Sequence, residues 1–395
     1  LLVTRLFKPQ ANAARVADFL LNGTLDQDCN TFFVDIEQLP AGYAFCIERG
    51  QYRQWPYWQI DTTIQPGLTD APERFAALFE DSISLQLRSD VPVGVNLSGG
   101  LDSTSIICAA ARRRAANSGH SPLLAFCYMS PDFDESHYID ATLKQTGAKL
   151  VPLQISPQRI WQDFEKLLGF HDEPFHSMTA VIGYQLMQLA ADNGVKVLLN
   201  GQGADEVLGG YANYFRDYWY TLARAGQLGK AWSEIAAYAT AHGQAAMPLF
   251  GTLVKHMLQR TLQAIPSYRH LAQVNRTRTM GANDWFAPHL AEICSPDRQP
   301  ANPTLQRILC KSVRENPLPL YLRVEDRNSM ACSIEARVPF LDHRIVEFAF
   351  ALEPSWKLRG PWNKYILREA MRHRIPEHVR TRLDKMGFPT SVAGW

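Results

Sequence analysis

One segment near residue 100 has the residue types of an anion-binding loop. The sequence SGGLDS, residues 98–103, follows an apolar run that predicts a buried strand and precedes an expected helix. Paired glycines allow a tight turn, and the N–H groups of the loop and helix start then face one point, where the helix dipole adds to the attraction. Ser98 and Ser103 add hydroxyl donors. Asp102 is explained if it holds Mg²⁺ against phosphate groups.

This segment lacks the lysine of the GxxxxGK[ST] phosphate loop. It instead resembles the pyrophosphate loop (PP-loop) of ATP pyrophosphatases, which cleave ATP between the α and β phosphates. The alternative is a plain strand-to-helix turn in which the glycines make the turn and Asp102 caps the helix. The apolar strand directly before the loop favours the nucleotide-binding interpretation.

A second loop with acidic residues follows another expected strand. Residues 195–199 read VKVLL and are followed by NGQGADE, residues 200–206. Ligands of open α/β sheets bind beyond the carboxyl ends of strands, so Asp205 could meet Asp102 across one crevice. Two carboxylates beside one polyphosphate imply a shared metal ion, since like charges alone would repel. The alternative is a helix with an acidic first turn formed by Asp205 and Glu206.

The C-terminal part carries charged residues between apolar ones. Partners for a partly buried ion-pair network are available there, with the arginines at 323, 327 and 337 and the carboxylates at Glu325, Asp326 and Glu335. Such a network either positions structure or takes part in the chemistry. Lys364 opens a later helix and could reach a leaving pyrophosphate as a point charge, although an isolated lysine is ordinarily a solvated side chain.

Alternating strands and helices are expected to position these groups. Apolar runs predict strands at 91–97, 123–129, 150–155 and 195–199. Helical spacing predicts helices at 71–87, 104–114, 138–146, 161–168 and 180–191. This alternation implies a mostly parallel sheet. Outside this region we expect a short helix, strands and turns in 1–60, helices in 215–275, and mixed, largely helical structure in 318–395.

The composition narrows the class of protein. The chain has 395 residues, 46% of them hydrophobic, and a formal net charge of +1, which disfavours a nucleic-acid enzyme. Seven scattered cysteines without CxxC spacing predict reduced thiols in a cytoplasmic protein rather than disulfides or a zinc site. No run reaches the roughly 18 apolar residues of a membrane span. The sequence begins with Leu1 and not with an initiator methionine, and it ends at Trp395 without a clear stop signal, so we expect a fragment.

Taken together, these segments resemble asparagine synthetase and related glutamine-dependent synthetases. The motifs that carry the resemblance are SGGLDS, the segment 134–136, NGQGADEVLGGY, EDRNSMACSIEARVPFLDHR and WNKYILREA, in the family's order over most of the chain. The first 60 residues, with TFF, LPAG and the pair Tyr57 and Trp58, resemble the tail of the family's glutaminase domain. The family's N-terminal catalytic cysteine is absent from this chain, so glutamine hydrolysis by that route is not expected of it.

The resemblance implies an α/β fold, the PP-loop ATP pyrophosphatase (adenine nucleotide alpha hydrolase-like) parallel sheet with flanking helices, plus a remnant of an α+β N-terminal nucleophile glutaminase domain. The implied domains are 1–62 for the remnant and 70–395 for the synthetase. It also implies an ATP-dependent, amide-forming ligase that adenylates aspartate, releases pyrophosphate and uses ammonia from glutamine to make asparagine. The implied ligands are the small-molecule substrates, ATP and Mg²⁺. No nucleic acid or membrane partner is expected, and a homodimer is one assembly that the resemblance suggests.

The resemblance also implies roles for individual residues. The ATP-binding residues would be Leu97, Ser98, Gly99, Gly100, Leu101, Asp102, Ser103, Tyr128, Asn200 and Gly201. The metal ligands would be Asp102 and Asp205. The catalytic residues would be Lys364, Gln202 and Glu335.

One departure from the family concerns the acceptor. Well-known asparagine synthetases have a glutamate at the position of Gln202, and a glutamine side chain cannot act as a general base. Adenylation is therefore expected, while aspartate as the acceptor is open. The alternatives are a relative acting on another carboxylate, such as a surface sugar, a peptide or a β-lactam precursor, a catalytically silent ATP-binding module, or a tRNA-modifying PP-loop enzyme, which the near-neutral charge disfavours.

Overall fold

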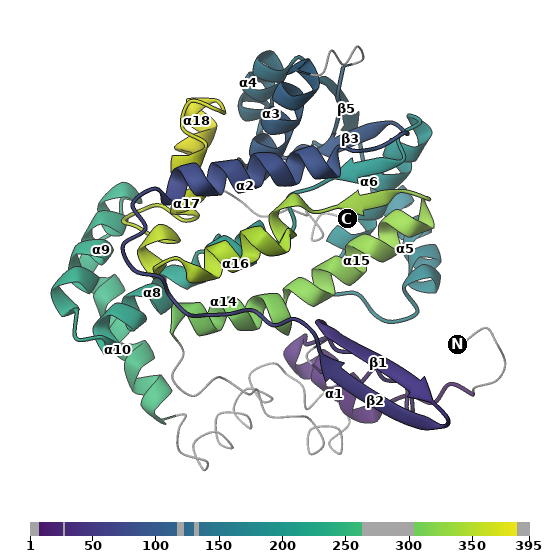
Figure 1. Cartoon of the computed structure of the whole chain (residues 1–395), viewed down its shortest axis with the longest axis horizontal. Helices are drawn as coiled ribbons and strands as arrows, with labels where there is room; N and C mark the ends of the chain where they lie inside the picture. Colours follow the sequence, from purple (N-terminus) through teal and green to yellow (C-terminus); the bar gives the residue numbers. More distant parts are fainter. Residues whose placement is uncertain (1–7, 27, 117–121, 130–133, 263–303, 385–395) are drawn as a thin grey trace. The chain divides into compact units, whose positions relative to one another are not determined.

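The computed structural model of the chain describes residues 8–26, 28–116, 122–129, 134–262 and 304–384 (Figure 1). Two compact units emerge. Residues 63–212 and 321–395 form one, which we call the sheet unit, and residues 1–62 and 213–320 form the other, which we call the hairpin unit. The expectations for residues 1–5, 263–275 and 392–395 lie outside the described residues.

A five-stranded parallel sheet is the centre of the sheet unit. Its strands lie in the order β5-β4-β3-β6-β7, and every neighbouring pair is parallel. Their bounds are Val93–Asn96 for β3, Leu124–Tyr128 for β4, Lys149–Leu153 for β5, Val197–Leu199 for β6 and Glu335–Arg337 for β7. The chain runs outward from β3 through β4 to β5 and then returns to place β6 on the other side of β3. The carboxyl ends of β3 and β6 therefore form the point where the strand order reverses, at which open α/β sheets bind ligands.

Helices flank this sheet. The helix α3, Leu101–Ala116, packs against β3, and α6, Thr179–Asp192, packs against β4 and β5. All of the first ten residues of α3 are buried, including four polar ones, so this helix enters the core directly from the 98–100 turn. The other elements of the unit are α2 (Ala71–Gln86), α4 (Ser136–Thr146), α5 (Pro157–His171), α7 (Ala204–Leu208), η2 (Pro339–Leu341), α16 (His343–Ala351), η3 (Pro354–Trp356), α17 (Tyr365–Ala370) and α18 (Glu377–Arg380). The helix α15, Leu318–Ala331, begins at the boundary between the units.

The core beside the sheet explains why the apolar runs form strands. Phe126 of β4 and Leu198 of β6 pack with Ile182, Leu186 and other buried side chains of α6. A parallel strand covered by helices has no solvated face, so an uninterrupted apolar run such as VLL suits it better than alternation does. This packing fixes β6, whose carboxyl end carries the second loop, and β4, which pairs with the β3 strand that carries the first.

The described part of the hairpin unit, residues 8–26, 28–62, 213–262 and 304–320, contains a short helix, a β-hairpin and four further helices. Its elements are α1 (Ala13–Asn22), β1 (Tyr43–Glu48), β2 (Gln51–Pro56), α8 (Asn213–Arg224), α9 (Leu228–Ala241), α10 (Ala246–Leu262) and α14 (Leu305–Arg314). The strands pair antiparallel, and the side-chain oxygen of Asn12 caps α1 by accepting from the Arg15 N–H. The helix α9 packs against α8 and α10.

The parallel sheet with flanking helices is confirmed. The sequence did not predict β7, because a three-residue edge strand with two charged residues has no apolar run to reveal it. The division into a glutaminase remnant at 1–62 and a synthetase domain at 70–395 stays a prediction, as does the remnant's fold.

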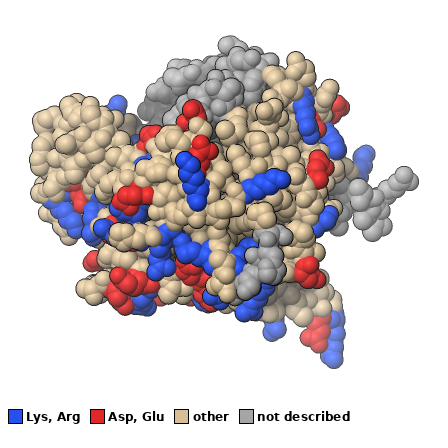
Figure 2. Space-filling view, turned by 90° about the horizontal axis from the view of Figure 1, so that it is seen from above, with Lys and Arg blue, Asp and Glu red and all other residues tan. Residues whose placement is uncertain are grey.

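Three bulk properties can be read from the described part of the chain. The six cysteines it contains are free thiols. Among the described helices, none is both long enough and apolar enough to cross a bilayer. Figure 2 shows basic and acidic side chains interspersed on one face, as a formal net charge of +1 leads one to expect.

Candidate active site

The loop that follows β3 turns sharply into α3. Gly99 has φ of +69°, a conformation that strongly favours glycine, and a Cβ at this position would lie only 3.2 Å from Tyr138 Cβ, a tight contact. The Ser98 N–H donates to Ser103 Oγ over 3.1 Å, and the two hydroxyl oxygens lie 3.2 Å apart. The Gly100 carbonyl accepts from Ser103 Oγ and from the first turn of α3. The two serines therefore close the loop at its base.

The loop that follows β6 lies directly against the first one. A Cβ on Gly201 would lie 3.0 Å from Asp102 Cβ, so the backbone of the second loop touches the side chain of the first. Asn200 organises this loop, because its Oδ1 accepts from the Gln202 N–H over 3.0 Å while its Nδ2 donates to Glu325 Oε1. The two carboxylates predicted to meet, Asp102 and Asp205, do come together, because both contact the ammonium nitrogen of Lys364.

Lys364 lies between these two carboxylates. Its ammonium nitrogen is 2.5 Å from Asp102 Oδ2 and 2.6 Å from Asp205 Oδ1, and the side chain is 1% exposed. Lys364 immediately precedes α17 in the left-handed region, with φ of +48°, which costs a non-glycine residue on the order of 1 kcal/mol. The fold retains this strained backbone conformation at a residue that joins two loops.

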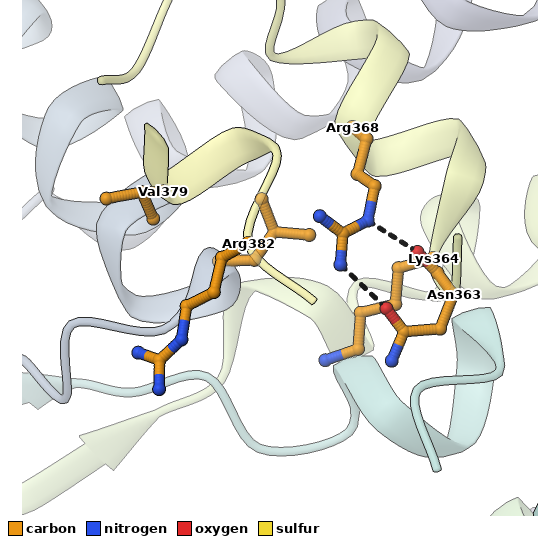
Figure 3. A pocket seen from close by; sticks show the side chains of 6 residues that line it. Asn363, Lys364, Arg368, Val379 and Arg382 are labelled. Carbon is orange, nitrogen blue, oxygen red and sulfur yellow. Dashed lines mark hydrogen bonds between the residues drawn. The ribbon is translucent and has the colours of Figure 1, made fainter. Parts of the chain in front are cut away.

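Neighbouring residues fix the place of Lys364. Asn363 Nδ2 donates to the Gly210 carbonyl over 2.6 Å. Arg368 donates to both the carbonyl and the side-chain oxygen of Asn363 (Figure 3). Gly210 passes so close to the ion pair that a Cβ there would lie 1.7 Å from Asp205 Oδ1 and 2.3 Å from Lys364 Cε. Burial lowers the pKa of Arg368 to about 10, with Asp102 opposing the shift, so Arg368 stays cationic at neutral pH.

A cleft of about 500 Å³ opens beside these loops. Most of the predicted site residues line it, namely Leu97, Ser98, Gly100, Asp102, Ser103, Tyr128, Asn200, Gly201, Gln202 and Asp205. Leu101 and Lys364 instead line a small adjoining cavity together with Arg368 and Arg382 (Figure 3). Gly99 lines neither, because it packs against α4.

Glu335 is the predicted catalytic residue that the structure does not bring to the cleft. It is the first residue of β7, opposite Val197 at the start of β6, whereas the site lies at the carboxyl ends of the strands. Its side chain is 60% exposed and pairs with Arg337 over 2.7 Å, which lowers its pKa. The geometry therefore makes Glu335 a partner of Arg337 and not a cleft residue.

The expected network of charges is also arranged differently. Arg323 pairs with Glu173, and Arg327 lies 3.3 Å from Asp172, so these two arginines hold α15 against the end of α5. Of the charged residues expected to form the network, Arg337 and Glu335 do form an ion pair, over 2.7 Å.

Glu325 is a cleft residue whose role the sequence did not identify. It accepts from Asn200 Nδ2, and burial raises its pKa to about 7, with the hydrogen bond from Asn200 opposing the shift. Glu206, in α7, accepts from the Tyr211 hydroxyl, and burial raises its pKa as well. Glu325 comes from the same charged segment as Glu335, and only the fold distinguishes the two glutamates.

The chemistry of the site suits a nucleotide and a hard cation. Apolar and aromatic residues at the ends of β3 and β4, including Leu97, Phe126 and Tyr128, offer a surface for a base. Asp102 and Asp205 offer oxygen ligands, and no group of three metal-binding side chains occurs among the described residues. Mg²⁺ typically binds one or two carboxylates and completes its shell with water and phosphate oxygens. The two aspartates therefore fit a magnesium ion that arrives with a polyphosphate.

Comparison with known proteins identifies the family of this chain. The family model described as asparagine synthase matches residues 74–395, most of the chain. The chain belongs to the asparagine synthase family. The matched region contains the whole five-stranded sheet, both loops and Lys364.

Relatives of this chain carry two kinds of name. It is 28% identical over 339 residues to asparagine synthetase [glutamine-hydrolyzing] 1 of Bacillus subtilis, covering 80% of this chain and 49% of the relative. It is 25% identical to asparagine synthetase [glutamine-hydrolyzing] 2 of the same organism, covering 88% and 44%. It is 24% identical to the amidase chry2 of Gibberella zeae, covering 89% and 58%. The chain thus spans about half the length of the curated relatives it matches.

Proposed function

We propose that this protein is an ATP-dependent ligase that activates a carboxylate as an acyl-adenylate and converts it to an amide. The observation that carries the proposal is the contact of one buried ammonium, Lys364, with carboxylates from both loops, 2.5 Å from Asp102 and 2.6 Å from Asp205. A buried cation and two carboxylates beyond the carboxyl ends of β3 and β6 support a nucleotide site there, because ligands of open α/β sheets bind at such ends.

The proposed reaction has two steps. An oxygen of the substrate carboxylate attacks the α phosphorus of ATP, and the bond to the β-phosphate oxygen breaks to release pyrophosphate. Ammonia then attacks the acyl carbon, loses a proton, and the acyl–oxygen bond breaks to release AMP. The N–H groups of 99–103 and the hydroxyls of Ser98 and Ser103 bind the polyphosphate, and Lys364 stabilises charge on the leaving group.

The other site residues have proposed roles in binding. Leu97, Tyr128, Asn200 and Gly201 contact the adenosine. Asp102 and Asp205 hold Mg²⁺, which supplies Lewis-acid stabilisation of phosphate charge when bound. Gln202 orients the acceptor by hydrogen bonds, because its amide is neutral at every pH.

Aspartate is the proposed acceptor, with ammonia from glutamine as the nitrogen source and asparagine as the product. The second candidate is a related ligase acting on a different carboxylate. Two observations favour it, since position 202 carries a glutamine and some relatives are named amidases.

The test supplies the protein with ATP, Mg²⁺, ammonium and aspartate and measures pyrophosphate together with asparagine. Equal amounts of both products support the aspartate ligase. Pyrophosphate release that depends on another carboxylate, with none for aspartate, supports the second candidate. Failure to bind ATP contradicts the proposed function.

A further inference from the structure

Arg382, just after α18, makes a set of contacts behind the 98–103 loop. Its Nη1 donates to the Gly99 carbonyl over 3.3 Å, and its Nη2 pairs with Glu135 Oε1 over 2.6 Å. Its guanidinium lies 4.2 Å from the centre of the Tyr138 ring, and its Nε donates to Asp384 over 3.0 Å. The arginine is 7% exposed, so the fold holds a buried cation against one carbonyl of the loop.

We propose that Arg382 is a positioning residue for the phosphate-binding loop. This inference rests on the proposed ATP site. A peptide group is planar and trans, so the carbonyl of one residue and the N–H of the next point in opposite directions. Arg382 draws the Gly99 carbonyl away from the cleft, which directs the Gly100 N–H toward the cleft that Gly100 lines.

The next peptide group is fixed in the same sense. The Gly100 carbonyl accepts from the Thr104 N–H over 3.1 Å and from Ser103 Oγ over 3.3 Å, so it points into α3. Within the part of the chain that the structure describes, the Gly100 N–H has no protein acceptor. The carbonyls of Gly99 and Gly100 thus point away from the cleft, and the Gly100 N–H between them is available to an anion.

Glu135 and Tyr138 connect this arrangement to α4. Glu135 precedes α4, lines the cleft and pairs with Arg382, while Tyr138 contacts both Gly99 and the guanidinium. A guanidinium can reach a carbonyl, a carboxylate and a ring face at once, whereas an ammonium cannot satisfy all three. The planar, branched shape of the Arg382 guanidinium, and not its positive charge alone, therefore orients the loop.

The test compares Arg382→Met and Arg382→Lys with the full-length wild type and with Arg372→Met, a matched surface control. Arg372 also pairs with a carboxylate, but its side chain is 53% exposed and its partner, Glu369, lies only three residues away in the same segment. Binding of ATP, pyrophosphate and adenosine is measured by calorimetry for each protein. Both Arg382 variants should bind ATP and pyrophosphate about tenfold more weakly, because a charge-assisted hydrogen bond that orients the anion site is lost. Adenosine should bind as to wild type.

The possible results are distinguishable. Unchanged ATP binding by Arg382→Met overturns the inference, and so does an equal loss of adenosine, which would report general damage to the cleft. Wild-type affinity in Arg382→Lys also overturns it, because charge alone would then suffice. If the wild type binds no ATP, the proposed function fails and the inference fails with it.

Discussion

Gly210 allows the most direct perturbation of the proposed site without removing any functional group. In Gly210→Ala, the new Cβ would lie 1.7 Å from Asp205 Oδ1 and 2.3 Å from Lys364 Cε, where contacts under 3.0 Å are not tolerated. The carboxylate must therefore retreat by more than an ångström. Relaxing the Asp205–Lys364 separation from 2.6 Å to about 4 Å weakens their attraction by roughly 2 kcal/mol at an effective dielectric constant of about 20.

This loss should appear in catalysis and in stability. If the attraction between Asp205 and Lys364 is needed in the transition state, losing about 2 kcal/mol of it lowers kcat/KM for ATP about 30-fold. Overpacking adds a cost of about 1–3 kcal/mol to the free energy of unfolding. The assays are carboxylate-dependent pyrophosphate release and denaturant unfolding.

Gly169→Ala is the matched control. Gly169 lies within α5, and no heavy atom would lie within 4 Å of an added Cβ. This substitution should leave activity unchanged and stabilise the helix by about 0.5–1 kcal/mol. A Gly210→Ala protein with wild-type kcat/KM and stability would refute a functional role for the contact between Lys364 and Asp205.

Three further predictions concern buried charges. Lys364→Met removes the ammonium that joins Asp102 and Asp205 and should lower pyrophosphate release at least about 100-fold, measured at saturating ATP. Burial raises the pKa of Glu325 from 4.5 to about 7, so between these values the folded state keeps a proton that the unfolded chain has lost. The unfolding free energy of the wild type should therefore fall between about pH 4.5 and 7 by more than that of Glu325→Gln, as measured by urea denaturation at each pH. The same pH dependence in both proteins would contradict this. Burial lowers the pKa of Lys357 from 10.5 to about 7, so stability should rise from about pH 7 to 10.5 in the wild type, and a similar rise in Lys357→Met would show that another group is responsible.

The sequence predicted the sheet well because four of its strands are apolar segments between turns. The strands predicted at 123–129 and 150–155 correspond to β4 and β5, whose ends differ from the predicted ones by one or two residues. The fifth strand, β7, has the composition of a surface segment, so only its pairing with β6 reveals it.

The candidate site could be predicted in part. Asp102 and Asp205 each follow an expected strand, and the rule that ligands bind at the carboxyl ends of parallel strands was enough to bring them together. Lys364 lies 262 residues from Asp102, and only the family resemblance suggested it. Glu325 and Glu335 show the limit of reasoning from sequence patterns, because both belong to one charged segment. In the fold Glu325 lies in the helix α15 and lines the cleft, whereas Glu335 lies at the start of the strand β7 and does not.

Arg382 could not be found from the sequence. It is one of several arginines near the C-terminal end of the described residues, and its contacts with Gly99 and Glu135 span more than two hundred residues. A role that depends on the direction of one peptide group leaves no mark in composition or spacing.

The measurement that tests the central claim most directly follows oxygen from the substrate carboxylate. The protein is supplied with ATP, Mg²⁺, ammonium and the ¹⁸O-labelled carboxylate that supports turnover, beginning with aspartate, and the nucleotide product is analysed by mass spectrometry. Formation of an acyl-adenylate predicts AMP that carries one ¹⁸O atom, with unlabelled pyrophosphate. ADP with labelled inorganic phosphate, or AMP without label, would contradict the acyl-adenylate mechanism.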